Sequence, residues 1–152
     1  MTFRSLAIAL LLVAGAAQAA DAPSVKASDG WLRVLPGSLP AGGYVSFENL
    51  SDRAVSIVGA SSPDYAEAMV HRSSTDGGMG RMEMVDSVAL PPKGKLAFSP
   101  GGYHVMLMDL KAPLAKDSSV PLTLRLRDAK GVERKLELVV PVAAAAPGAH
   151  KH

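Results

Sequence analysis

Hydrophobic and polar residues alternate along most of the chain in short runs that are typical of half-buried β-strands. The alternation is clearest in Leu122-Thr123-Leu124-Arg125-Leu126-Arg127, where the leucines share one face, and it recurs in Lys135-Leu136-Glu137-Leu138. Glycine, proline, asparagine and aspartate separate the runs, as they do in turns between strands. The pattern predicts strands over residues 31–34, 43–49, 54–58, 68–73, 81–85, 95–98, 103–110, 120–127 and 133–142.

Helical periodicity is nearly absent. Only residues 63–68 could form a turn or two of helix, with Ser62 as the N-cap and Pro63 at the first position. About nine short strands at this spacing predict an all-β fold, a Greek-key sandwich or barrel. With no internal repeat and no second domain in the pattern, we expect one β domain over residues 20–142 and a flexible Ala/Pro/His tail over 143–152.

The first 19 residues have the pattern of a cleavable signal peptide. Arg4 supplies the positive charge, residues 6–13 (LAIALLLV) supply the apolar run, and Ala17-Gln18-Ala19 is the expected cleavage site. The apolar run is too short to span a bilayer, and no other segment approaches the required length. We therefore expect a mature chain that is exported to the periplasm and has no membrane span.

The charge balance is close to neutral. The 152 residues contain 16 Lys and Arg against 14 Asp and Glu, and removal of the signal peptide takes away one arginine and no acidic residue. Such a balance gives no electrostatic reason to expect nucleic acid or a polybasic membrane contact.

Cysteine is absent, whereas methionine is clustered. The absence of cysteine excludes disulfides, thiolate metal sites, thiol nucleophiles and CxxC redox chemistry. All the methionines after Met1 lie between positions 69 and 108: Met69, Met79, Met82, Met84, Met106 and Met108. Either methionine fills part of the core there, or its thioether groups form a metal site.

The predicted strands place Met and His side chains two residues apart. Residues i and i+2 of a strand point to the same face, about 6.5 to 7 Å apart. This spacing joins Met69 with His71, Met82 with Met84, and His104 with Met106 and Met108. Three strands would each present soft or borderline donors on one face, while Tyr103, Val105 and Leu107 on the opposite face would supply core.

These donor types favour one ion. A thioether is neutral and soft, so methionine sulfur combined with imidazole favours Cu(I) over zinc, calcium or magnesium. Taken singly, a methionine is more typical of core packing and a histidine of a structural hydrogen bond. Together, these positions combine every methionine of the mature chain with His71 and His104, which favours a metal site. In the tail, His150 and His152 could capture Cu(II), or they belong to a solvated chain end.

The spacing of four of these residues resembles that of a known family. His71, Met82, His104 and Met106 stand in the order His-x10-Met-x21-His-x-Met, the signature of the periplasmic copper chaperones called PCuAC, or DUF461. Other segments similar to the family are residues 41–44 (AGGY), 78–82 (GMGRM), 100–108 (PGGYHVMLM), 112–114 (APL) and 120–124 (VPLTL). The resemblance extends over residues 28–142.

The resemblance implies a cupredoxin-like β-sandwich that carries Cu(I) at an exposed site. It also implies delivery of that copper to the binuclear copper centre in the copper subunit of cytochrome c oxidase, often alongside a Sco-type thiol protein. Carried over by position, the ligands would be His71, Met82, His104 and Met106, and any of Met79, Met84 and Met108 could complete or replace one of them.

Enzymatic and electron-transfer roles find no support in the motifs. No nucleophile elbow surrounds any serine, and residues 77–80 lack the lysine and helix of a phosphate loop. Blue-copper electron carriers need a Cys thiolate, which this chain lacks. We therefore expect a binding protein and not an enzyme.

Two functions stay open at this point. One is a Cu(I) metallochaperone that delivers to cytochrome c oxidase, and the other is a periplasmic copper buffer or resistance protein without a dedicated acceptor. A structural sandwich whose methionines only pack is the third interpretation.

Overall fold

This computed structural model describes residues 24–115 and 117–144 of the chain. These residues contain ten β-strands and one short 3₁₀ turn, joined by loops. The strands are β1 (Val25–Arg33), β2 (Ala41–Asn49), β3 (Val55–Ser61), β4 (Tyr65–Ser74), β5 (Arg81–Met84), β6 (Val88–Leu90), β7 (Lys95–Ala97), β8 (Tyr103–Leu110), β9 (Ser119–Asp128) and β10 (Glu133–Pro141). The 3₁₀ turn η1 (Asp76–Gly78) lies between β4 and β5. The expected signal peptide and the tail histidines His150 and His152 lie outside the described residues.

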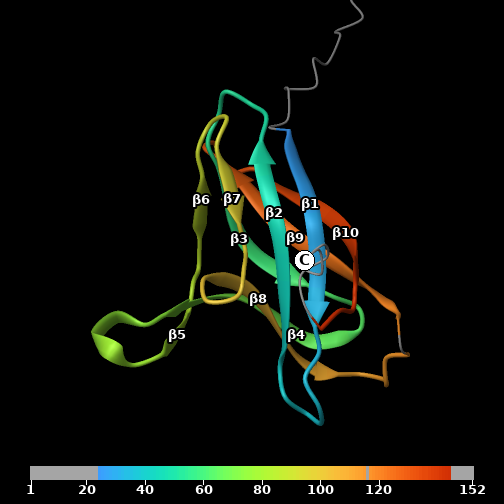
Figure 1. Cartoon of the computed structure of the whole chain (residues 1–152). Coiled ribbons are helices and arrows are strands. Elements are labelled where there is room, and N and C mark those ends of the chain that lie inside the picture. The colour runs from blue at the N-terminus through green and yellow to red at the C-terminus, as the bar shows by residue number, and fades with distance from the viewer. Residues whose placement is uncertain (1–23, 116, 145–152) are drawn as a thin grey trace, which may run out of the picture.

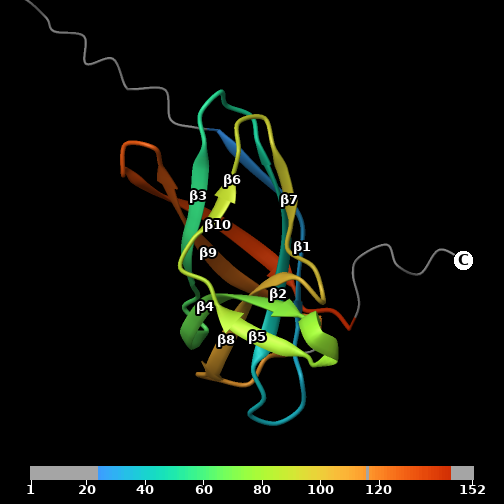
Figure 2. The ribbon, with the colours of Figure 1, turned by 90° about the vertical axis from the view of Figure 1, so that its left-hand side faces the viewer.

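The strands form two antiparallel sheets that pack face to face (Figure 1). Sheet A has the order β1-β2-β8-β4-β5, with β7 paired to β2 beside this path, and sheet B has the order β10-β9-β3-β6. The chain passes repeatedly from one sheet to the other, as Greek-key connections do. In Figure 2, β4, β5 and β8 lie together at one end of the molecule, beside the loop that joins β1 to β2. The all-β prediction is confirmed.

The alternation along β9 becomes an inner and an outer face. Leu122, Leu124 and Leu126 are buried between the sheets, whereas Arg125 and Arg127 are exposed. On the facing side, the inner residues of sheet A include Leu32, Val45, Val105 and Leu107. Burial of these aliphatic side chains drives the two sheets together without a disulfide.

The predicted helix over residues 63–68 is wrong, because Tyr65 begins strand β4. The Ser62 hydroxyl accepts a hydrogen bond from the Asp64 backbone N–H at 3.3 Å, which makes a local turn and not a helix cap. Tyr65 then pairs with Leu110 of β8, and its side chain is buried. Pairing with β8 outweighs the weak local helix propensity.

The structure has one strand that the sequence pattern did not predict and one that begins earlier than predicted. The unpredicted strand, β6, is only three residues long, and it pairs with β3 through Val88 and Leu90, which are both buried. Strand β1 starts at Val25 and not at Trp31, because Asp29 and Gly30 form a bulge within the strand instead of a turn before it.

Asn49 closes the end of β2 that lies away from the β1–β2 loop. Its side chain is completely buried, and its amide N donates to the carbonyl groups of Arg53 (2.7 Å), Leu90 (3.2 Å) and Pro91 (3.2 Å). Its side-chain oxygen accepts from the backbone N–H and hydroxyl of Ser51 at 3.0 and 2.7 Å. This one amide therefore ties β2 of sheet A to the end of β6 in sheet B.

Within the described residues, we find no helix with the length and apolar character needed to cross a membrane.

Candidate metal centre

Strand pairing gathers the Met and His side chains on the outer face of sheet A. In the antiparallel register, His71 of β4 lies opposite His104 of β8, and Met69 lies opposite Met106. On the other side of β4, Met84 of β5 lies opposite His71, and Met82 lies opposite Ser73. Directly opposed residues of an antiparallel pair point to the same face of the sheet. Three strands that are distant in sequence thus converge on one patch.

The methionines of this patch do not fill the core. Met79, Met82 and Met84 are 71%, 53% and 65% exposed. The core face of β8 is made by Val105 and Leu107, as predicted, and both are completely buried. For the three exposed methionines, the core-packing interpretation is therefore wrong.

His104 is held in the tautomer that a metal ligand needs. The side chain is 6% exposed, and its Nδ1 lies 3.3 Å from the Gly102 carbonyl oxygen. A carbonyl can only accept a hydrogen bond, so Nδ1 carries the proton and Nε2 keeps a free lone pair. This is the arrangement by which proteins orient an imidazole toward a metal.

His71 carries two buried ring nitrogens without a partner. Among the described residues, neither Nδ1 nor Nε2 of His71 has a hydrogen-bond partner, and its ring centroid lies 5.8 Å from that of His104. Burial, reinforced by repulsion from His104, lowers the pKa of His71 below its ordinary value. Buried polar atoms are normally paired, so a neutral imidazole left unpaired in a patch of thioethers fits a metal ion as its missing partner.

A cleft of about 290 Å³ opens at this patch. Its walls include Met82, His104 and Met106, three of the four residues that the sequence motif singles out. The fourth, His71, lies beside the cleft with its ring against that of His104. The structure thus brings all four residues together from β4, β5 and β8.

Of the three methionines that could be additional ligands, only one lies near the two histidines. Met84 lies opposite His71 and is near the histidine pair. Met79 follows η1 in the β4–β5 hairpin, and Met108 lies opposite Glu67; neither of them lines the cleft. The hairpin turn requires glycine, because Gly77 and Gly78 have φ angles of 75° and 76°.

Gly42 and Tyr44 of β2, which sequence reasoning did not assign to the site, also line the cleft. The Trp31 and Tyr44 rings lie 4.7 Å apart, and Tyr44 lies 6.4 Å from the ring of His104. Gly42 faces Met106, and a Cβ atom on it would lie 2.9 Å from the Tyr44 hydroxyl oxygen. The alternation of residues 41–49 would have shown that Gly42 and Tyr44 share a face, but not that this face continues onto β8.

The donor set is unusual in its chemistry. Within the described chain, there is no group of three or more His, Cys, Asp or Glu side chains that could hold a metal. Two imidazoles and neutral thioethers are what remains, and these donors select soft ions over hard, oxygen-preferring ones.

Comparisons with known proteins identify the family of the chain. Residues 25–142 match the family described as "Putative lipoprotein LpqE-like". A curated relative, "Putative lipoprotein Lxx21020" of Leifsonia xyli, is 32% identical over 109 residues, which cover 71% of this chain and 65% of the relative. The alignment thus spans less than two thirds of the length of that relative.

Solved structures show the same fold. A copper-bound PCuAC domain from PmoF2 is 26% identical with a TM-score of 0.60, and the match covers 80% of this chain and 97% of that domain. DR1885 from Deinococcus radiodurans matches in its apo form at 29% identity and a TM-score of 0.58, over 95% of this chain and 96% of that one. Its Cu(I) form matches at 30% identity and a TM-score of 0.57, over 86% and 83%.

The two antiparallel sheets thus form the cupredoxin-like sandwich of these PCuAC structures. The chain belongs to the LpqE-like family, of the PCuAC (DUF461) type.

Proposed function

We propose that this protein is a periplasmic copper metallochaperone that binds Cu(I) through His71, Met82, His104 and Met106. We further propose that it delivers this copper to the binuclear copper centre of cytochrome c oxidase. The observation that carries the proposal is the pair of imidazoles with free ring nitrogens beside thioethers in an open cleft. The names of the similar structures support it, because a PCuAC domain of PmoF2 is copper-bound and DR1885 is known in a Cu(I) form.

The chemistry of the donors suits a carrier of copper. Thioether sulfur and neutral imidazole hold Cu(I) without cancelling its charge, whereas an acceptor with anionic thiolates binds the same ion more strongly. Met82 is 53% exposed on the edge strand β5. A thiolate of the acceptor protein can therefore bind the metal before the other ligands dissociate from it. Transfer then runs downhill through an intermediate in which both proteins share the ion.

The location and the accessory partners follow the same interpretation. The signal-like residues 1–19 and the lipoprotein names of the relatives support an exported protein of the cell envelope. A Sco-type thiol protein would assist in assembly of the oxidase copper centre. The tail histidines His150 and His152 would capture Cu(II) as a second, separate site.

A competition titration tests the copper site. Wild type is expected to take one Cu(I) from a chromophoric chelator, and His104→Ala/Met106→Ala is expected to lose this stoichiometric site because it removes an imidazole and a thioether from the cleft. The matched control, Val132→Ala/Val139→Ala, shortens two exposed side chains outside sheet A and should bind as wild type does. No binding by wild type would end the copper proposal.

A copper buffer is the alternative function, and a genetic experiment separates it from delivery. The gene is deleted in its host, and oxidase activity is measured under copper limitation. Loss of activity that is restored by wild type but not by His104→Ala/Met106→Ala supports delivery. Unchanged oxidase activity in the deletion strain favours the buffer.

A further inference from the structure

Arg33 stands at the edge of the metal cleft without an acidic partner. Its guanidinium carbon lies 5.3 Å from the centre of the Trp31 ring and 5.7 Å from that of Tyr44, distances at which a cation and an aromatic ring attract each other. Among the described residues, the guanidinium makes no hydrogen bond and no ion pair. The two rings therefore hold a charged group at the cleft while its N–H donors stay unused.

The cleft itself contains no compensating negative charge. Of the described residues that line it, Arg33 is the only one with a formal charge, and none is Asp or Glu. Bound Cu(I) would add a second positive charge, because imidazole and thioether are neutral ligands.

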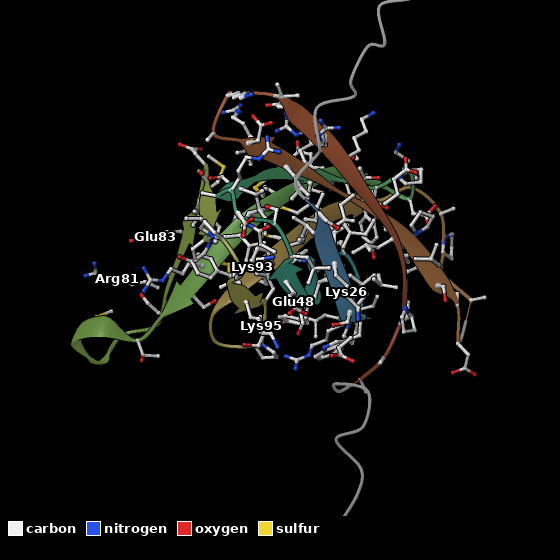
Figure 3. The ribbon with its side chains drawn as sticks, turned by 90° about the horizontal axis from the view of Figure 1, so that it is seen from above. Lys26, Glu48, Arg81, Glu83, Lys93 and Lys95 are labelled. Atoms are coloured by element: carbon white, nitrogen blue, oxygen red, sulfur yellow. The ribbon has the colours of Figure 1, made fainter. Side chains whose placement is uncertain are left out.

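Two lysines outside the cleft differ from Arg33 in having acidic partners: Lys93 forms an ion pair with Asp52 at 3.7 Å, and Lys95 forms one with Glu48 at 3.8 Å. Lys93, Lys95 and Glu48 appear in the view from above in Figure 3.

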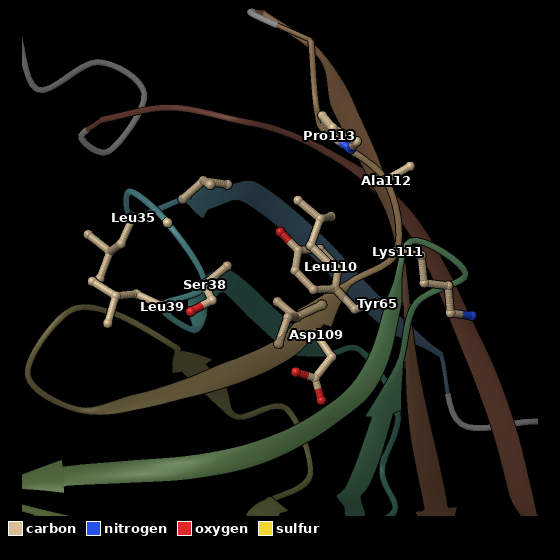
Figure 4. A pocket seen from close by; sticks show the side chains of 13 residues that line it. Leu35, Ser38, Leu39, Tyr65, Asp109, Leu110, Lys111, Ala112 and Pro113 are labelled. Carbon is tan, nitrogen blue, oxygen red and sulfur yellow. The ribbon is translucent and has the colours of Figure 1, made fainter.

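An apolar rim continues from the cleft. A neighbouring groove of about 530 Å³ shares Leu35 and Ala41 with it, and Leu35, Leu39 and Leu110 line that groove (Figure 4). Within the described chain, ten large hydrophobic side chains are exposed; four of them line the groove, and three are methionines of residues 79–84. Exposed apolar side chains gathered in this way mark interaction surfaces.

We propose that Arg33 and the apolar rim of Leu35 and Leu39 form the docking surface for the protein that accepts the copper, and that Arg33 pairs there with a carboxylate next to the acceptor's thiolate ligands. This inference rests on the proposed delivery function. Charge complementarity selects the occupant, because a half-buried guanidinium without an acidic partner favours an acidic group and disfavours a basic one. The planar guanidinium can meet a carboxylate with two parallel hydrogen bonds, which would also orient the acceptor over Met82.

The experiment measures copper transfer to two acceptors. One is the reduced, copper-free soluble domain that carries the binuclear centre of cytochrome c oxidase, and the other is neocuproine, a neutral chelator that needs no docking. The variants are Arg33→Glu and the neutral Arg33→Gln. The matched control, Arg134→Glu, makes the same charge change on an exposed residue of β10 in sheet B.

Neocuproine is needed because Arg33→Glu has a second effect. A glutamate near the cleft attracts Cu(I), so the variant holds copper more tightly and releases it more slowly to any acceptor. The informative quantity is therefore the transfer rate to the protein acceptor divided by the rate to neocuproine. We expect this ratio to fall about tenfold or more in Arg33→Glu, less in Arg33→Gln, and not at all in Arg134→Glu. Added salt should slow protein transfer from wild type more than from Arg33→Gln.

The outcomes separate the docking surface from the function on which it rests. Equal ratios for wild type, Arg33→Glu and Arg33→Gln overturn the docking proposal while copper delivery stands. Wild type that binds Cu(I) but transfers none to the oxidase domain overturns delivery, and the docking proposal with it. Cu(I) binding by each variant in the same assay shows that the variant is folded.

Discussion

His71 and His104 are the two nitrogen donors of the proposed site, and their surroundings differ. The Gly102 carbonyl holds His104 in one tautomer, whereas His71 is left with unpaired ring nitrogens and a lowered pKa. A lowered pKa keeps an imidazole neutral at a more acidic pH than usual. The arrangement therefore favours a histidine that is ready to bind a cation over one that carries a proton.

The pKa of His71 leads to a prediction about pH. Cu(I) binds only a neutral imidazole, so protons compete with the ion where the pH is low enough to protonate a histidine ligand, and the ordinary histidine pKa is about 6.5. A lowered pKa keeps His71 neutral to a more acidic pH than usual, so we expect Cu(I) affinity to weaken as pH falls from 8 to 5, with the loss at His71 setting in below about pH 6.5. Chelator competition between pH 5 and 8 measures this. Affinity that does not change over the whole range would contradict histidine ligation.

At the scale of elements, the site depends on strand pairing more than on any single strand. Strand β4 is the centre of it, because β8 on one side and β5 on the other place their donors opposite His71. The β4–β5 hairpin projects from the body of the sandwich (Figure 1), which exposes Met82 and Met84. Paired strands therefore position the histidines firmly and leave the thioethers of β5 accessible.

Asn49 is the polar tie between elements, and removing it tests how much it contributes. Asn49→Ala removes the side-chain donor to the carbonyl groups of Arg53 and Leu90, of which the contact with Leu90 is buried, whereas the Pro91 carbonyl keeps the Gly94 backbone N–H at 2.9 Å. Unpaired buried polar groups are costly, so we expect the free energy of unfolding to fall by about 1–3 kcal/mol. Urea unfolding of the copper-free protein measures this. Ser62→Ala, which removes only a local hydrogen bond in the turn before β4, is the control, and an equal effect of both variants would contradict the role given to Asn49.

At the scale of the whole molecule, the core and the metal patch occupy opposite faces of sheet A. Val105 and Leu107 point between the sheets, while His104 and Met106 on the same strand point outward. Stability thus comes from burial between the sheets, and the proposed copper site lies on the outer face. This separation lets the thioethers of Met82 and Met84 stay exposed without a cost to the core.

A cavity in sheet B should therefore weaken the fold without changing the site. Leu124 of β9 is completely buried, and Leu124→Ala is expected to lower the free energy of unfolding by about 2–5 kcal/mol. Because Leu124 does not line the cleft, the folded variant should bind Cu(I) within about twofold of wild type, since distant sites are largely independent. Calorimetry and chelator competition measure the two quantities, and a large loss of affinity in a folded variant would refute the separation.

Periodicity in the sequence was sufficient for the fold class and for the faces of individual strands. The leucines of β9 and the split of β8 into Val105 and Leu107 against His104 and Met106 follow from the two-residue period alone. The resemblance to the PCuAC signature, and not the strand period, singled out the four residues that converge on the cleft. Local pattern failed where long-range pairing decides: Tyr65 belongs to a strand because β8 lies beside it, and β6 is too short to give a periodic signal.

The sequence by itself determined the donor chemistry, because a chain with clustered methionine and no cysteine can offer only thioether and imidazole to a soft metal. Only the tertiary structure decided which donors meet and what surrounds them. Strand order placed β4 between β5 and β8, and it brought Arg33 of β1 and Tyr44 of β2 to the cleft from across β8. It also left the ring nitrogens of His71 without a hydrogen-bond partner among the described residues. The physical reason is that a strand's own period specifies which face a side chain takes, whereas its neighbours across the sheet are chosen by burial of the common core.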